Sequence, residues 1–189
     1  MQREAIVGDQ VFVIRGFLSP EECSRFIAEF ERIGFSEAPV TTRFGAIRMP
    51  DIRDNDRLIV DDTGLAAHWF ERATPFLPRR IGSWELSGLN ERFRSYRYDP
   101  GQSFKRHLDG YFRRPDGERS LFTFMAYLND DFDGGTTAFY DADQQPIASI
   151  VPEQGMALVF RHAILHEGNP VEQGRKYVLR TDVMYRNVD

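Results

Sequence analysis

The chain has 189 residues, enough for one domain with a substantial buried core. Hydrophobic residues make up 41% and charged residues 28%, as is typical of a soluble globular protein. The formal net charge of −5 argues against a nucleic-acid-binding protein, whose contact surface would be basic.

The single cysteine, Cys23, excludes an internal disulfide and gives no sign of an oxidising compartment. The first residues, "MQREAIVGDQ", are too polar for a secretory signal, and no apolar run could span a bilayer. We therefore expect a cytoplasmic protein that does not associate with membranes.

Residues 11–35, "VFVIRGFLSPEECSRFIAEFERIGF", predict a strand followed by a helix. Ser19 is the expected N-cap, Pro20 suits the first helical position, and Glu22 completes a capping box. Gly34 suits the end of the helix. Five residues at helical spacing form the apolar face: Cys23, Phe26, Ile27, Phe30 and Ile33. Cys23 is thus interpreted as a packed thiol.

Residues 36–62 are rich in Pro, Gly and charge, and we interpret them as a long irregular loop of the kind that is usually a functional lid or disordered. A second helix is expected from about Thr63 to Thr74. Its apolar face comprises Leu65, Ala66, Trp69, Phe70 and Ala73. His68 lies outside that face and is interpreted as a surface or packed residue, not as a metal ligand.

After Ser83 the pattern changes to short β-like runs separated by turn signals. Eight such runs predict a mainly β fold, a jelly roll, with the two helices covering one outer sheet face. The runs are "ERFRSYRY", "SFKRHLD", "SLFTFMAYLN", "TTAFYDA", "IASIV", "MALVF", "LHEGNP" and "KYVLRTDVMYR".

Alternation within two of these runs assigns their faces. In "KYVLRTDVMY", Lys176, Arg180 and Asp182 oppose an apolar face, and in "LFTFMAYL" Tyr127 opposes another. If the apolar faces meet the helices, Lys176, Arg180 and Tyr127 point into the barrel. Charges inside a small barrel are costly unless they are paired, so this arrangement predicts a polar cavity that holds an anion.

Basic residues are concentrated between Arg92 and Arg119, where eight Arg and Lys stand against four Asp and Glu. A solvated strand face and loop would explain most of them. An electrostatic funnel for an anionic ligand is the alternative.

The run "RHLDG" places His107 and Asp109 on the same side of a strand, where both can approach one ion. His166, in "ILHEGNPVEQGRKY", lies on a late strand that a jelly roll returns beside the earlier ones. Two imidazoles and one carboxylate are the ligand set of non-haem Fe(II) oxygenases. A His-x-Asp pair is weak evidence by itself, but its combination with a downstream histidine and an inward-facing lysine is far more specific.

Three blocks in the right order resemble the Fe(II)/2-oxoglutarate-dependent dioxygenases, specifically the prolyl and lysyl hydroxylase-like branch: "YDPGQSFKRHLD", "AYLNDDFDGGTTAFY" and "HEGNPVEQGRKYVLRTDV". The resemblance covers about the last hundred residues. It implies one domain, 1–189, with a jelly-roll core over 91–189 and with helical support and substrate-side loops over 1–90.

The resemblance also implies roles for individual residues. His107, Asp109 and His166 would bind iron and form the catalytic centre, and Lys176 would pair with the far carboxylate of 2-oxoglutarate. Three further residues would contribute to the co-substrate pocket: Tyr127, Tyr98 and Thr137. Arg180 shares the predicted face of Lys176, and it could instead bind the co-substrate, reach the substrate or pair with Asp182.

The implied reaction consumes 2-oxoglutarate and O2, releases succinate and CO2, and hydroxylates an unactivated C–H bond. The resemblance favours a prolyl or other peptide residue as the substrate, and a small anionic molecule is the alternative. We expect the mouth of the substrate site to be formed by Ser36–Val60 and "YFRRPDGERS". A zinc-dependent hydrolase and a non-catalytic cupin-like binding protein stay open as other uses of the same ligands.

Other interpretations of the histidines are weaker. His162 and His166 have the spacing of a zinc metalloprotease helix, but Ala163 stands where that motif needs glutamate. We expect His162 to pack or to act behind the ligands, and Glu167 to bond solvent or a loop. Asp109 argues against a halogenase, in which the carboxylate ligand is replaced.

Overall fold

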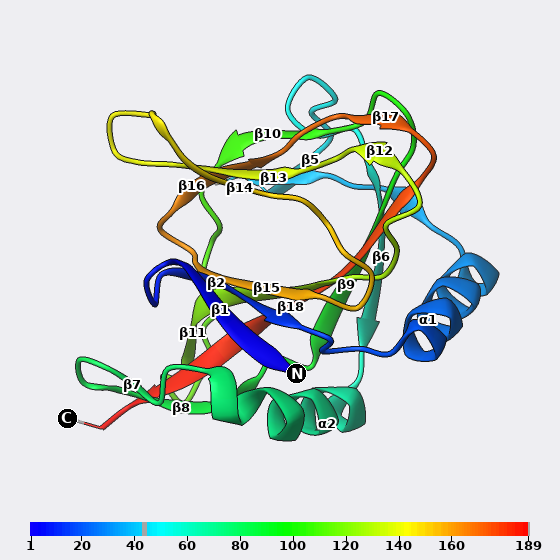
Figure 1. Ribbon diagram of the computed structural model, residues 1–189. Coiled ribbons are helices and arrows are strands. Elements are labelled where there is room, and N and C mark those ends of the chain that lie inside the picture. The colour runs from blue at the N-terminus through cyan, green and yellow to red at the C-terminus, as the bar shows by residue number, and fades with distance from the viewer. Residues whose placement is uncertain (43–44, 189) are drawn as a thin grey trace.

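The computed structural model describes residues 1–42 and 45–188. It is built on two sheets that face each other (Figure 1). The larger sheet has ten strands. Eight of them follow one another in the order β1 (Gln2–Val7), β2 (Val11–Arg15), β15 (Ala157–Arg161), β11 (Arg119–Tyr127), β18 (Lys176–Asn187), β9 (Arg92–Tyr98), β6 (Asp56–Asp61) and β3 (Ser36–Glu37). The other two form a branch: β8 (Trp84–Leu89) pairs with β18, and β7 (Arg80–Ile81) pairs with β8.

The smaller sheet has four strands in the order β10 (Phe104–His107), β16 (Leu165–Gly168), β13 (Thr137–Tyr140) and β14 (Pro146–Ile150). Two short pairs complete the β structure: β12 (Asp133–Gly134) with β17 (Val171–Gln173), and β4 (Val40–Thr42) with β5 (Gly45–Ile47). All the pairings are antiparallel. The mainly β jelly-roll prediction is confirmed.

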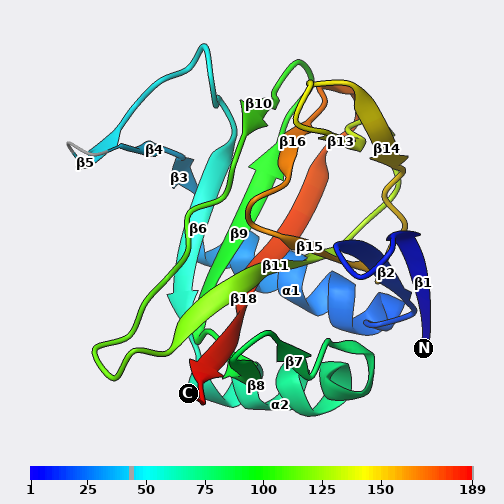
Figure 2. The ribbon, with the colours of Figure 1, turned by 90° about the vertical axis from the view of Figure 1, so that its left-hand side faces the viewer.

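Two helices lie on the outer side of the larger sheet: α1 (Pro20–Ile33) and α2 (Thr63–Ala73), which runs into a 3-10 turn, η1 (Thr74–Phe76) (Figure 2). Ser19 and Glu22 form the predicted capping box, and the amide of Gly34 donates to the carbonyl of Phe30 where α1 ends. Ile33 is the exception on the predicted apolar face, because it is 48% exposed. No helix in the described ranges is long and apolar enough to cross a bilayer.

Two apolar cores lie on opposite sides of the larger sheet. The outer core joins Trp69 and Cys23 of the helices to Phe122, Phe124 and other residues of the sheet. The inner core lies between the sheets and includes Tyr127, Tyr98 and Val178. Alternation along β11 and β18 therefore has the predicted sense, with the apolar faces toward the helices and the polar faces toward the barrel.

The prediction of one irregular loop over residues 36–62 is wrong for much of that stretch. Asp56–Asp61 forms β6, which pairs along β9 from Asp56↔Arg97 to Asp61↔Arg92, and β3 and β5 are short strands. β6 is polar at both ends and half-exposed, so its own residues do not predict a strand. It becomes a strand because it pairs with β9. Residues 43 and 44 of the predicted mouth lie outside the described residues.

Candidate active site

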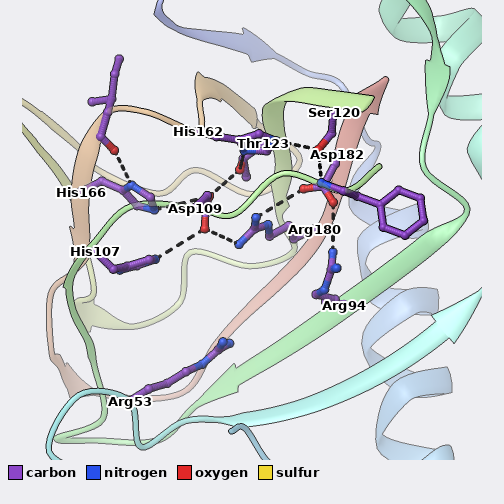
Figure 3. Close-up of polar contacts among 12 residues, drawn as sticks. Arg53, Arg94, His107, Asp109, Ser120, Thr123, His162, His166, Arg180 and Asp182 are labelled. Atoms are coloured by element: carbon purple, nitrogen blue, oxygen red, sulfur yellow. Dashed lines mark hydrogen bonds and ion pairs between the residues drawn. The ribbon is translucent and has the colours of Figure 1, made fainter. Parts of the chain in front are cut away.

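Strand pairing brings His107 and His166 together from positions far apart in the sequence. β10 and β16 are antiparallel neighbours in which these two histidines are direct register partners. Asp109 follows two residues after His107, and the ligand-capable atoms of the three side chains all lie within 4.8 Å of one another. Asp109 Oδ1 lies 3.7 Å from His107 Nε2, and Asp109 Oδ2 lies 3.6 Å from His166 Nε2 (Figure 3).

Each imidazole is oriented by a backbone carbonyl. Nδ1 of His107 is 2.7 Å from the carbonyl oxygen of Lys105, and Nδ1 of His166 is 2.9 Å from that of Ile164. A carbonyl only accepts hydrogen bonds, so Nδ1 carries the proton in both rings and the lone pair of Nε2 faces Asp109. Burial, followed by the neighbouring His166, lowers the pKa of His107 to about 3, and burial also lowers the pKa of His166. Both rings are therefore neutral donors.

The Asp109 carboxylate is held on both oxygens. Arg180 Nη1 donates to Oδ1 at 2.8 Å, and the Thr123 hydroxyl donates to Oδ2 at 2.5 Å. Burial alone would raise the pKa of Asp109, but the charge of Arg180, with the hydrogen bond from Thr123, outweighs it and holds the pKa well below its usual range. The site thus presents one fixed negative charge.

A further layer fixes Thr123. Nδ1 of His162 lies 3.1 Å from the Thr123 hydroxyl, and Nε2 of the same ring lies 2.9 Å from the Ser120 hydroxyl. His162 therefore lies behind the three candidate ligands, as the sequence predicted. Ser120 and Thr123 were missed, because a lone hydroxyl on a strand has no sequence signal that points to a distant aspartate.

The residues fit a divalent transition metal. Two neutral imidazole nitrogens and one ionised carboxylate converge on a common point, and each histidine has the carbonyl partner on its other nitrogen that metal-binding histidines commonly have. Three protein ligands would leave coordination positions for small molecules, as the 2-His-1-carboxylate set does in Fe(II) oxygenases.

An inner cavity of about 50 Å³ opens beside the histidines, within the barrel. Lys176, only 3% exposed, reaches its wall, and its Nζ donates to the Gly135 carbonyl at 2.6 Å. Burial lowers the pKa of Lys176 to about 7. Nζ also lies 5.3 Å from the ring centres of both Tyr98 and Tyr127, so two aromatic faces lie near the ammonium group in addition to the carbonyl.

Tyr127, Thr137 and Tyr98, the other residues predicted for the co-substrate pocket, lie near this lysine. The Tyr127 hydroxyl lies 2.8 Å from Oγ1 of Thr137, and Tyr98 is the register partner of Lys176 on the adjacent strand. Tyr98 and Thr137 line the inner cavity itself. Burial raises the pKa of Tyr98 to about 12, so the phenol stays a neutral hydrogen-bond donor.

The basic residues near Lys176 are already engaged. Arg180 contacts Asp109 and also Asp182, at 3.3 Å, while Arg175 bonds Asp99 at 2.6 Å on the surface. Within residues 1–42 and 45–188, Lys176 has no carboxylate partner. Among these three residues, Lys176 is thus the cation whose charge is left for a ligand.

Most of the basic cluster between Arg92 and Arg119 belongs to the fold and not to a funnel. Arg92 pairs with Asp61 at 2.9 Å, and Arg97 pairs with Asp56 at 2.7 Å, which ties β9 to β6. Arg114 pairs with Glu91 and with Glu118. The acidic partners of Arg92 and Arg97 come from outside the cluster, so the local excess of positive charge is largely neutralised.

Comparison with known proteins agrees with this geometry. Residues 93–181 match the family described as the 2OG-Fe(II) oxygenase superfamily. This stretch of the chain is similar to the members of that superfamily. It contains all three candidate ligands, and the family uses Fe(II), 2-oxoglutarate and O2, which confirms the cofactor prediction at the level of the family.

Several relatives are prolyl hydroxylases, so the predicted likeness to that branch is confirmed. Prolyl 4-hydroxylase 1 of Arabidopsis thaliana is 27% identical over 141 residues, which cover 69% of this chain and 46% of that protein. The chain thus spans about half the length of this curated relative.

Two solved structures share the fold. A Pseudomonas putida prolyl-4-hydroxylase aligns with a TM-score of 0.68 at 20% identity, covering 95% of this chain and 94% of its own. A Trichoplax adhaerens prolyl hydroxylase in complex with a hypoxia-inducible-factor peptide aligns with a TM-score of 0.70 at 18% identity, covering 93% and 83%.

Proposed function

We propose that this protein is an Fe(II)- and 2-oxoglutarate-dependent hydroxylase that oxidises an unactivated C–H bond. The observation that carries the proposal is the convergence of His107, Asp109 and His166 beside a cavity whose buried lysine has no carboxylate partner among the described residues. A site for a dicarboxylate next to a site for a metal is what this chemistry needs.

His107, Asp109 and His166 would hold the iron. When bound, Fe(II) with 2-oxoglutarate supplies the oxidising power: one O2 is consumed, 2-oxoglutarate becomes succinate and CO2, and the substrate C–H becomes C–OH. The protein contributes position and charge. The carbonyls of Lys105 and Ile164 keep both Nε2 lone pairs available, and Arg180 and Thr123 keep Asp109 ionised and oriented.

Lys176 would anchor the far carboxylate of 2-oxoglutarate by exchanging its bond to the Gly135 carbonyl for a charge-assisted one. Tyr127, with Thr137, would add a hydroxyl donor, and Tyr98 would close the pocket. Gly135 is required here because its φ is +62° and an added Cβ would lie 2.9 Å from the Phe132 ring and 3.2 Å from Lys176 Cδ. Arg180 would act on the metal side, through Asp109.

The names of the relatives favour a prolyl or other peptide residue as the substrate. The predicted mouth is supported in part by the cavity outside the three ligands, to which Ile52, Arg53 and Arg57 contribute from the first segment and Tyr111 and Phe112 from the second.

An anaerobic titration tests the proposal. Apo protein given Fe(II) and then 2-oxoglutarate should develop the visible charge-transfer band of the chelate, and admission of O2 should yield succinate. His107→Ala should abolish the band, whereas Lys176→Met should raise the concentration of 2-oxoglutarate needed to form it. A band without succinate would indicate a binding protein, and tighter binding of zinc with hydrolysis of an ester probe would indicate a hydrolase.

A further inference from the structure

A second cavity, of about 300 Å³, lies on the outer side of the candidate ligands. Its wall contains His107 and Asp109, and it shares His107, Tyr96, Phe104 and Arg180 with the inner cavity. The two cavities therefore meet at the candidate metal centre, with Lys176 on the inner side only. The outer cavity is where a substrate would approach the oxidising centre.

Four guanidinium groups line the outer cavity, together with two carboxylates: Arg53, Arg57, Arg94, Arg180, Asp109 and Asp182. Both carboxylates are already committed. Asp182 accepts from Arg94 at 3.2 Å and from Arg180 at 3.3 Å, and Asp109 accepts from Arg180 and is a candidate metal ligand. Arg53 and Arg57 have no carboxylate partner in the described ranges, so two positive charges are left over.

Arg53 is a buried cation with a free edge. It is 6% exposed, and its guanidinium carbon lies 4.4 Å and 4.5 Å from the ring centres of Tyr96 and Phe104. Nε donates to the neutral side chain of Asn55 at 2.8 Å, but the buried Nη2 has no hydrogen-bond partner in the described part of the chain. Figure 3 shows the guanidinium directed toward the side of the site where Asp109 and Arg180 lie.

Leaving a buried cationic donor without an acceptor costs free energy. A ligand that accepts a hydrogen bond from Nη2 would remove this cost, and its binding free energy would be more favourable. The position of Arg53 is also well fixed, because its backbone forms a β-bridge with Phe104 at the start of β10. That bridge ties Arg53 to the strand that carries His107.

Arg57 adds a second positive charge from β6. No carboxylate of the described residues pairs with it, and burial together with the charges of Arg53 and Arg94 lowers its pKa. Tyr96 responds to the same charges: burial would raise the pKa of its phenol, yet Arg53, Arg180 and Arg94 bring it below the usual value. The outer cavity thus has an excess of positive charge in a chain of net charge −5.

We propose that Arg53 and Arg57 bind a carboxylate of the primary substrate and so hold the neighbouring C–H bond at the metal centre. This inference rests on the proposed hydroxylase function. Planar guanidinium groups recognise carboxylates through paired hydrogen bonds, and a cavity of this size admits a small acid or a single acidic residue of a peptide. The shared chemistry is a carboxylate close to the oxidised carbon.

The test measures substrate-stimulated succinate formation by the Fe(II) protein with saturating 2-oxoglutarate and O2. One panel contains N-acetyl amino acids as free acids and as N-methylamides. A second contains peptides capped at both ends, with Asp or Asn beside each candidate residue. Stimulation by free acids over their amides identifies a small acid as the source, and stimulation by Asp peptides over Asn peptides identifies an acidic peptide.

For the stimulating acid, Arg53→Met and Arg57→Met should each lower kcat/KM by about 10- to 100-fold, the range expected for a lost charge-assisted hydrogen bond. The dissociation constant of 2-oxoglutarate should change less than about twofold. Arg25→Met, at an exposed position on α1 that lines neither cavity, is the matched control. If Arg53→Met does not fold, the same measurement is made on Arg57→Met, at a half-exposed position, and on Arg53→Lys. The lysine keeps the positive charge but lacks the planar guanidinium group.

Equal stimulation by acids and amides, or unchanged kcat/KM in the folded variants, would overturn the inference. The inference would also be overturned if succinate forms but no member of either panel accelerates its formation. That result would leave the proposed hydroxylase function uncontradicted. If Arg53→Met weakens 2-oxoglutarate binding and Lys176→Met does not, Arg53 binds the co-substrate and not the primary substrate, and the inference is wrong. Absence of any 2-oxoglutarate turnover would reject both proposals.

Discussion

Lys176 lies at a buried position where, among the described residues, two aromatic rings and a carbonyl are the partners of the ammonium group. Its pKa of about 7 means that the ligand-free protein holds a mixture of charged and neutral lysine near neutral pH. A dicarboxylate pairs only with the charged form. If Lys176 anchors 2-oxoglutarate as proposed, co-substrate binding depends on the protonation of this lysine.

We expect the affinity for 2-oxoglutarate to be greatest below pH 7 and to fall by up to about tenfold for each pH unit above it. The reason is that the lysine must take up a proton before it binds, while both carboxylates of the ligand stay ionised throughout. Anaerobic titrations of the Fe(II) protein between pH 6.5 and 9, monitored by the charge-transfer band, measure the effect.

Lys176→Arg is the matched variant, because a guanidinium stays charged over the whole range and should remove the pH dependence. Calorimetry in buffers of different ionisation enthalpy should also record proton uptake on binding to the wild-type protein at pH 8. An affinity that does not change between pH 7 and 9 would contradict the assignment of Lys176.

At the scale of the elements, α2 covers the face of the larger sheet that lies opposite the site. Trp69 is the centre of that contact: it is 1% exposed, and its ring meets Phe17, Phe93 and Phe124 at centroid distances of 5.2, 5.4 and 5.7 Å. β9, β11 and β18 carry their site residues on the other face, so the helix supports the site without contacting it.

Trp69→Ala should lower the free energy of unfolding by about 3–5 kcal/mol, because it leaves a large cavity under the helix. Chemical denaturation measures the change. Ile59→Ala, at a position on β6 that is 42% exposed, is the control and should stay within about 0.5 kcal/mol of the wild type. Similar losses in the two variants would show that the outer core does not determine stability.

At the scale of the whole molecule, the candidate metal site links the two sheets. His107 and His166 belong to the smaller sheet, whereas Asp109 is held by Thr123 and Arg180 of the larger one. A ligand that binds the folded site but not the unfolded chain adds to the free energy of unfolding.

Anaerobic Fe(II) at 100 times its dissociation constant should therefore stabilise the protein by about 2.7 kcal/mol. For a chain of this size, that corresponds to a rise in the thermal midpoint of roughly 5–11 °C. Thermal unfolding followed by circular dichroism measures the shift, and EDTA should reverse it. An equal shift in His166→Ala would show that the metal binds elsewhere.

Local sequence patterns predicted the elements whose own residues specify them. Helix α1 follows from Ser19, Glu22 and Gly34 together with the apolar spacing, and the orientation of β11 and β18 follows from strict alternation. His107 and Asp109 lie on one short segment, so their shared direction was also predictable. The likeness to prolyl hydroxylases was visible in the motifs because residues that bind one group recur at fixed spacing.

The tertiary structure decided what depends on pairing between distant segments. The β10–β16 register sets His107 opposite His166. Arg180 and Arg175 form ion pairs with Asp109, Asp182 and Asp99, whereas Lys176 has no carboxylate partner in the part of the chain that the structure describes. β6 forms because β9 pairs with it, and that pairing carries Arg57 to the outer cavity beside Arg53. Periodicity and capping act over a few residues, so a local sequence shows them. A charge is neutralised by whichever group the fold brings within a few ångströms of it, and a single sequence does not show the distance between two groups that lie far apart in the chain.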